Sequence, residues 1–210
     1  MTSPLDRLAS ALGRRDEEPN VAPARDLAAG GNVADVAALA AALGTAPRPI
    51  RHDAIKALYE VGALRPDLVR PHAGAFLAAM NGIDNRLAWG ALAALDTLAA
   101  HDPGLIAAHL PEILAAAARG SVIAKDKAVS ILATLAALPG IAPEAWAALL
   151  AMVEGAAVNQ AAMYAEAALR AAPMNDPAAL AALLRKRRDG IVQPAKRARL
   201  EKVLRQLARL

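Results

Sequence analysis

The residues of this chain that could bind a metal are too widely spaced to form a metal-binding motif. The histidines are His52, His72, His101 and His109, and cysteine is absent. Structural and catalytic zinc sites draw on Cys, His or carboxylate ligands at short spacings such as HExxH. No such spacing occurs here. His72 and His109 lie 37 residues apart, which is the spacing at which apolar residues also recur along the chain. We therefore expect no metal and no cofactor.

The sequence also contains no motif that pairs a nucleophile with a general base. The serines are Ser3, Ser10, Ser121 and Ser130, and none lies in a GxSxG sequence. The phosphate-binding patterns GxxxxGK[ST] and GxGxxG are also absent. Carboxylates such as Glu60, Asp96 and Glu166 fall on polar faces of predicted helices, and no two share one face as an acid–base pair would require. The sequence therefore predicts a protein that is not an enzyme.

Basic residues recur where the second helix of each predicted hairpin begins. They are Arg51, Arg86, Lys125 and Lys196, at offsets of 35, 39 and 71 residues. Cations at a helix N-terminus oppose the helix dipole, so their recurrence needs a reason. One hypothesis is a row of cations that binds an acidic partner. The other is structural: the side chains extend over the turn and bond loop carbonyls, which holds the repeats in register.

The C-terminal residues 185–210, here called the basic end, concentrate the positive charge. They hold ten Lys or Arg and two Asp or Glu, a net charge of +8, whereas residues 1–184 carry −4. The candidate binding residues of this end are Arg185, Lys186, Arg187, Arg188, Lys196 and Arg197. They either contact nucleic acid or an anionic membrane surface, or they solubilise a capping helix whose outer face must be polar. No aromatic residue lies among them, so base stacking on single strands is not expected.

The composition favours helices throughout. Hydrophobic residues make up 56% of the chain and aromatic residues 2%, so Ala and Leu carry the hydrophobicity. The N-terminus has no apolar signal-peptide core, and no apolar run reaches the length of about 20 residues that a spanning helix needs. We expect a cytoplasmic protein without a membrane span, and the Ala- and Arg-rich usage suggests a bacterial source.

Glycine and proline divide the chain at a nearly fixed period. The glycines that follow apolar helical runs, at spacings of 38, 38, 35 and 35, are Gly44, Gly82, Gly120, Gly155 and Gly190. Each is expected to close a helix in the left-handed conformation. The prolines that precede the next hairpin, at spacings of 37, 36 and 34, are Pro66, Pro103, Pro139 and Pro173.

Apolar residues repeat at the same period. Leu95 and Leu98 match Leu132 and Leu135 at an offset of 37, and the i, i+3, i+4 spacing is that of one helical face. The predicted repeats, each a helical hairpin, are 33–65, 66–102, 103–138, 139–172 and 173–210. Residues 1–32 are expected to form a cap, with a helix from Pro4 to Leu12 and a loop from Arg14 to Arg25.

The most typical repeat, residues 109–138, resembles a HEAT repeat. It has Leu110-Pro111 early in its first helix, a short turn, Lys125 early in its second helix and an Ala/Leu run. The resemblance implies an all-α, right-handed α–α superhelix whose second helices line the concave side. The sequence departs from the family pattern in the fourth repeat, where Ala162 takes the basic position.

The function predicted is a non-catalytic scaffold for protein–protein interaction. Its candidate concave-face residues are Arg51, Arg86, Trp89, Lys125 and Lys127. Trp89 lies either in the core or at the surface as an anchor, whereas Trp146 aligns with Leu110 and is expected to be buried. The alternative function is nucleic-acid binding through the basic end. The resemblance alone implies a third, an enzyme-associated role.

Overall fold

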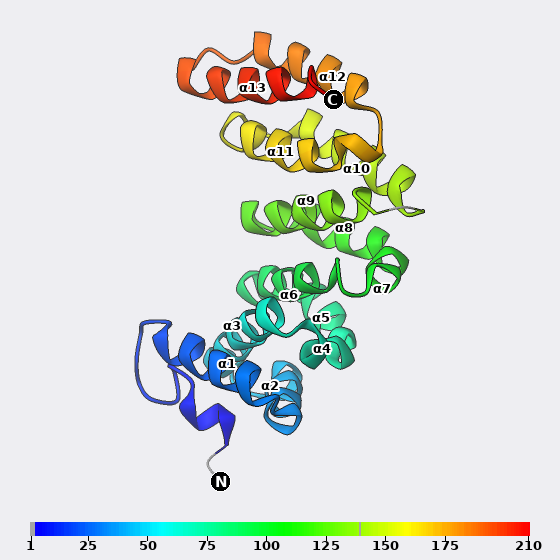
Figure 1. Cartoon of the computed structure of the whole chain (residues 1–210). Helices are drawn as coiled ribbons and strands as arrows, with labels where there is room; N and C mark the ends of the chain where they lie inside the picture. The colour runs from blue at the N-terminus through cyan, green and yellow to red at the C-terminus, as the bar shows by residue number, and fades with distance from the viewer. Residues whose placement is uncertain (1–2, 139) are drawn as a thin grey trace. The chain divides into compact units, whose positions relative to one another are not determined.

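Every regular element in residues 3–138 and 140–210, which the computed structural model describes, is a helix (Figure 1). The all-α prediction is therefore confirmed, while Pro139, one of the predicted repeat boundaries, lies outside the described residues. The chain forms two compact bodies. The N-terminal body extends to Ala128 and the C-terminal body comprises Val129–Leu210.

The helices have the lengths and order of repeated hairpins. In the N-terminal body they are the 3₁₀ turn η1 (Pro4–Arg7), α1 (Glu18–Gly30), α2 (Val33–Thr45), α3 (Arg48–Leu64), α4 (Pro66–Val69), η2 (Arg70–His72), α5 (Ala73–Met80), α6 (Asn85–Leu98), α7 (Pro103–Ala108) and α8 (Leu110–Arg119). Helix α9 (Val122–Ala136) spans the boundary between the bodies. The C-terminal body continues with α10 (Ala142–Gly155), α11 (Val158–Ala171), η3 (Ala172–Met174), α12 (Pro177–Asp189) and α13 (Pro194–Leu207).

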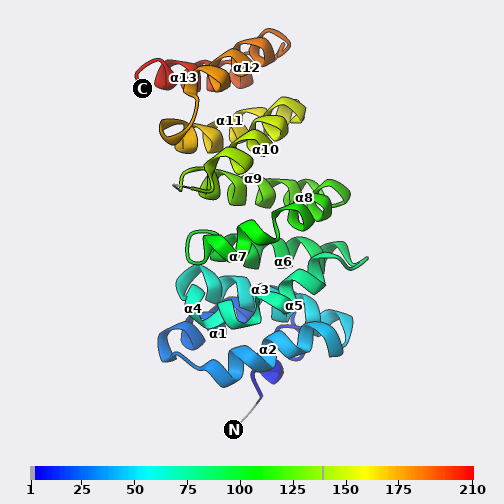
Figure 2. The ribbon, with the colours of Figure 1, turned by 90° about the vertical axis from the view of Figure 1, so that its right-hand side faces the viewer.

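In the N-terminal body, helices α1, α3 and α6 form one row (Figure 2). Helix α3 packs against α1 and α6, while α2 packs on α3 and α5 packs on α6. The interfaces are filled by aliphatic side chains and by Phe76, which is fully buried. Each hairpin thus buries its apolar faces against its neighbours, as stacked repeats do.

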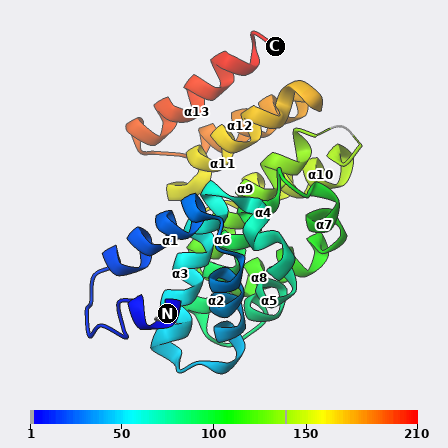
Figure 3. The same cartoon turned by 60° about the horizontal axis from the view of Figure 1, so that its bottom comes forward.

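The C-terminal body repeats this arrangement. Helix α11 packs against α10 and α13, and α12 packs against α13 (Figure 3). The inner face of α13 presents Leu200, Val203 and Leu207, all buried. Trp146 of α10 is 7% exposed, so its predicted burial is confirmed.

Small residues let α3 and α6 approach closely. A Cβ placed on Gly90 of α6 would lie 2.9 Å from two carbons of Ile55 in α3, closer than atoms in a relaxed core. A Cβ on Gly62 of α3 would meet Thr97 of α6 at 2.4 Å. Both glycines therefore serve close packing in the middle of helices, where glycine otherwise costs stability.

Aspartates fix the starts of several helices. Asp84 precedes α6 and accepts hydrogen bonds from the backbone N–H groups of Arg86 and Leu87, at 3.1 and 3.3 Å. Asp102 and Asp176 cap α7 and α12 in the same way. These bonds satisfy N–H groups that have no acceptor within the helix.

The N-terminal prediction is wrong in both of its parts. The segment Pro4–Leu12 contains only the short turn η1, and helix α1 occupies most of the predicted loop Arg14–Arg25. The prolines of this segment suggested a loop, but Pro19 lies in the first turn of α1, where a missing N–H costs nothing. Packing of the buried residues Ala24 and Leu27 stabilises the rest of the helix.

The expected left-handed glycines are also wrong. Among the described residues, positive φ angles occur at Gly13, Gly31 and Gly140, and at none of the five repeat glycines. Gly31 closes α1 with φ 62°. Gly120 is extended, and its lack of a side chain serves close packing instead, because a Cβ there would lie 2.7 Å from the Cβ of Ala124.

Candidate functional site

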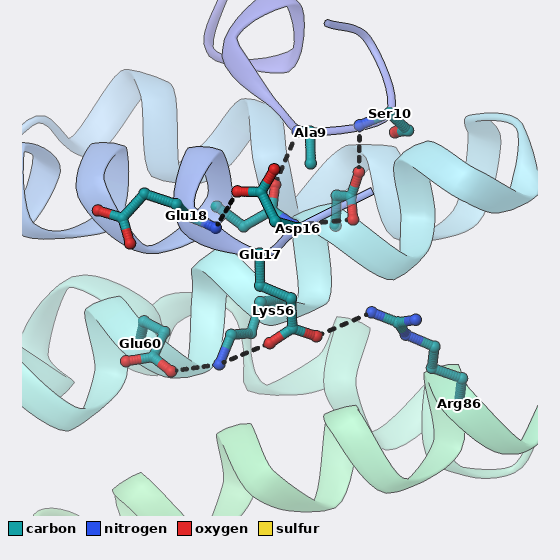
Figure 4. A network of polar contacts seen from close by, with 10 residues as sticks. Ala9, Ser10, Asp16, Glu17, Glu18, Lys56, Glu60 and Arg86 are labelled. Carbon is teal, nitrogen blue, oxygen red and sulfur yellow. Dashed lines mark hydrogen bonds and ion pairs between the residues drawn. The ribbon is translucent and has the colours of Figure 1, made fainter. Parts of the chain in front are cut away.

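A buried polar cluster holds the N-terminal segment against α1 and α3. Asn20 is fully buried and Asp53 is 8% exposed. Asp53 accepts hydrogen bonds from the Ser10 backbone N–H at 2.7 Å and from the Asn20 side-chain amide at 2.8 Å. Asn20 in turn accepts from the Ala9 backbone N–H at 2.9 Å (Figure 4). The residues before α1 are therefore fixed on the row of α1 and α3.

Next to this cluster, Glu17 links α1 to both α3 and α6. One carboxylate oxygen lies 3.1 Å from the Arg86 guanidinium, and the other lies 3.4 Å from the Lys56 ammonium (Figure 4). Lys56 also contacts Glu60 at 2.6 Å. Sequence reasoning missed Glu17 and Lys56. Only the Lys56–Glu60 contact had a local signal, the i, i+4 spacing of opposite charges on a helix.

Two aromatic rings adjoin these charges. The Lys56 ammonium lies 4.7 Å from the centre of the Tyr59 ring, and the Tyr59 and Trp89 ring centres are 6.2 Å apart. Both rings are partly exposed, so Trp89 lies at the surface of α6 and outside the core. We call Lys56, Tyr59, Glu60, Arg86 and Trp89 the α3–α6 surface.

The Lys56 ammonium is held in its charged form. Burial lowers its pKa, but the contacts with Glu60 and Tyr59 raise it by more, so that the pKa lies above the usual range for lysine. The ammonium is therefore protonated at neutral pH. This fixed charge is available to a carboxylate from either the same chain or another molecule.

The structure does not bring Arg51 together with Arg86. Arg51 lines a pocket of about 600 Å³ together with residues of α2 and α5, and its Nε is buried without a hydrogen-bond partner among the described residues. The core residues of α3 and α6 correspond at an offset of 37, for example Leu58 and Leu95. The offset of 35 between Arg51 and Arg86 is two residues short, which rotates the side chain by about 200° around the helix.

The remaining candidates of this group lie on α9. Lys127 contacts Asp96 of α6 at 3.2 Å. Lys125 is exposed and makes no ion pair within the part of the chain that the structure describes. Lys125 is 37 residues from Ala88, which is itself 37 residues from Arg51, so it shares the register of Arg51.

Most cations of the basic end contact other residues of the C-terminal body. Lys186 contacts Glu154 at 3.3 Å, Arg188 contacts Asp189 at 2.8 Å, and Arg197 contacts Glu201 at 3.6 Å. The Arg187 guanidinium donates to the Ala156 carbonyl, and Lys196 donates to the Asn159 side chain. Arg185 is exposed and has no such contact among the described residues. Lys196, a member of the predicted row of cations, bonds the side chain of Asn159 in α11 and no loop carbonyl, whereas Arg187, which lies outside that row, bonds the loop carbonyl of Ala156.

Two ion pairs hold the aspartates that cap α6 and α7. Arg48 contacts Asp84 and Arg70 contacts Asp102, both at 2.8 Å, across 36 and 32 residues. Burial raises the pKa of Asp84, but hydrogen bonds from His52, the Leu87 N–H and Arg48 lower it by more, to about 2. Asp84 is therefore ionised across the physiological range and ties α3 to the start of α6.

The histidines do not converge. His52 contacts Asp84 at 2.8 Å and His109 contacts Glu112 at 3.3 Å. Burial lowers the pKa of His72. The described residues contain no group of three or more metal-ligating side chains, and none of the described helices is long and apolar enough to cross a membrane.

The geometry defines a fold: stacked helical hairpins, with charged and aromatic side chains grouped on α3 and α6. Solved structures with this fold are similar to the chain. A designed armadillo repeat protein, solved in complex with the peptide (KR)4, matches with a TM-score of 0.67 at 14% identity, over 97% of this chain and 91% of that one. Two engineered proteins from a structural genomics consortium match with TM-scores of 0.60 and 0.58, each at 16% identity. The first match covers 99% of this chain and 98% of the other, and the second covers both chains completely, at 100%.

These likenesses show the fold and nothing finer, because the identities are low. No protein-family model matches the sequence. No curated protein matches it either. The repeat fold is thus established by structure, while the use of its surfaces is a matter for proposal.

Proposed function

We propose that the protein is a non-catalytic scaffold that binds a segment of another protein on the α3–α6 surface. The observation that carries the proposal is the grouping there of Tyr59 and Trp89 with Arg86 and Lys56. Aromatic residues and arginine dominate the binding energy of protein interfaces, since they offer large contact areas with a polar or charged group at the edge. Partly exposed rings beside fixed charges are suited to that role.

The fold supports the same reading. Stacked hairpins present a continuous helical surface to a partner chain. The designed armadillo protein that shares this fold was solved with a peptide bound, and that peptide is basic. In the present chain, the Arg86 guanidinium and the Lys56 ammonium on this surface already contact one carboxylate, that of Glu17, and we infer that the partner segment is acidic.

The basic end gives less support to the alternative function, nucleic-acid binding. Five of its six candidate residues already contact carboxylate, amide or carbonyl groups within the C-terminal body. Cations held in this way contribute less to counterion release from a nucleic acid. Nucleic-acid binding through this end stays a prediction.

Capture from the native cell tests the proposal. The full chain is immobilised, partners are captured from a lysate of the source organism, and the capture is repeated with Arg86→Glu combined with Trp89→Ala. The control is Arg119→Glu, an equal charge change on helix α8, where the Arg119 guanidinium donates a hydrogen bond to the side-chain oxygen of Asn81. We expect the double variant to lose the captured partner and the control to keep it. Equal capture by all three proteins would refute the proposed surface.

A further inference from the structure

We propose, building on the function proposed above, that Glu17 occupies a carboxylate-binding site formed by Lys56 and Arg86. An acidic side chain of the partner would replace it there. The segment before α1 would then act as an internal competitor for the binding surface, so that binding requires the Glu17 side chain to turn away.

The geometry is that of a carboxylate held between two cations. The two oxygens of Glu17 are divided between Arg86 at 3.1 Å and Lys56 at 3.4 Å. The Lys56 side chain is 14% exposed and is fixed from its other side by Glu60 and Tyr59. A preformed cationic site of this kind can bind another carboxylate in place of Glu17 without ordering further side chains.

The charges call for a single carboxylate. Lys56, Arg86 and Glu60 together carry a net charge of +1, which Glu17 neutralises. One aspartate or glutamate of a partner segment neutralises the site equally well, whereas binding it beside Glu17 would leave a net charge of −1. Exchange of one carboxylate for the other is therefore favoured over addition.

Glu17 can leave without unfolding its surroundings. Its side chain is 51% exposed and makes no hydrogen bond to the start of α1. The segment is held instead by the bonds from Ala9, Ser10 and Asn20. The contact of Glu17 with Arg86, which is 43% exposed, is open to water and therefore weak enough to exchange.

The experiment measures binding of a fluorescein-labelled acidic octapeptide, (ED)4, by fluorescence anisotropy at low salt. Removal of the competing charge by Glu17→Gln is expected to tighten binding by roughly threefold to tenfold, the value of two ion pairs in which the Glu17 side chain is half exposed to water. Glu18→Gln is the matched control, because Glu18 is exposed and its side chain makes no ion pair within the described residues. It should leave the affinity near that of the original chain.

Further variants separate the outcomes. Lys56→Gln and Arg86→Gln should each abolish the gain caused by Glu17→Gln, and (KR)4 should bind more weakly than (ED)4 to the Glu17→Gln variant, whose site carries a net charge of +1. Peptide binding that depends on Arg86 but is equal with and without Glu17 would overturn the internal competitor and leave the proposed function standing. Absence of (ED)4 binding in all variants would overturn the carboxylate site, while the cellular capture decides the proposed function separately. Protection of the Ala9 and Ser10 amides from hydrogen exchange verifies that each variant keeps the segment in place.

Discussion

Substitution of Asp53 by alanine should detach the N-terminal segment while the helical array stays folded. Asp53 is the acceptor for both the Ser10 N–H and the Asn20 amide, and it lies on α3, more than thirty residues away from either donor (33 and 43 residues). The Asp53 carboxylate is buried where the segment lies on α3, so water does not readily replace it as the acceptor for these two donors.

The size of the effect follows from the bonds and from the surface they cover. A hydrogen bond to a charged group contributes about 1.5 to 3 kcal/mol, so two such bonds set an upper limit of about 6 kcal/mol. The loss is smaller than this limit if the segment detaches, because the Ser10 N–H can then form a hydrogen bond with water. Detachment exposes the buried side chains of Leu8 and Ala9, which costs about 2 to 3 kcal/mol. We therefore expect a loss of about 2 to 4 kcal/mol in the free energy of unfolding.

Two measurements decide the matter. Equilibrium unfolding in guanidinium chloride gives the free energy, and amide hydrogen exchange at Ala9 and Ser10 reports the attachment of the segment. The control is Asp67→Ala, which removes an exposed partner of Arg65 and should leave the free energy of unfolding close to that of the original chain, because exposed ion pairs contribute little. If Asp53→Ala left the exchange of both amides unchanged, the segment would be held by other contacts and the reasoning would be refuted.

Three further predictions concern single side chains. The pKa of Asp84 is about 2 against an ordinary 3.8, so its charge stabilises the fold above pH 4 and this contribution is lost as the pH falls toward 2. In Asp84→Asn, the free energy of unfolding should therefore fall by about 2 kcal/mol less between pH 4 and pH 2 than in the original chain, and an unchanged pH profile would contradict this. Gly90→Ala should lower the thermal midpoint, because the new methyl group meets Ile55 at 2.9 Å and overpacking costs about 1 to 3 kcal/mol; Gly74→Ala, where a Cβ meets nothing within 4 Å, is the control and should not lower it. Asn175→Ala should cost about 1 to 2 kcal/mol in chemical denaturation, since the Asn175 amide donates to the carbonyls of Ala136 and Ala171 at 2.8 and 2.7 Å; full stability of this variant would show that water replaces both bonds.

The helical-repeat fold could be predicted from the sequence because its determinants are local. The spacing of residues such as Leu95 and Leu98 marks one helical face, and its recurrence after 37 residues marks the stacking. The placement of the first helix could not be predicted in this way. Two prolines and a run of charges are typical of a loop, whereas packing of α1 against α3, which is distant in the sequence, stabilises the segment around Leu27 as a helix.

The candidate surface was predicted in part. Arg86 and Trp89 were selected from the sequence, and the structure places both at the surface of α6. Glu17 lies 69 residues from Arg86, so nothing in the spacing relates the two. The predicted row of cations included Arg51 because each basic residue was aligned to the start of its helix. The packing of buried residues sets a different register, and a shift of two residues moves a side chain to another face.

The ion pairs between repeats also have a direction. Arg48 contacts Asp84 of the following repeat, and Arg70 contacts Asp102, which caps the first helix of the following repeat. From Asp96 onward, the carboxylate belongs to the earlier repeat and the cation to the later one, as in Glu154 with Lys186 and Glu166 with Arg199. The hairpins are therefore not interchangeable modules. Shuffling or duplicating them would separate the partners of these pairs at the new junctions, so the pairs favour the order in which the hairpins follow one another.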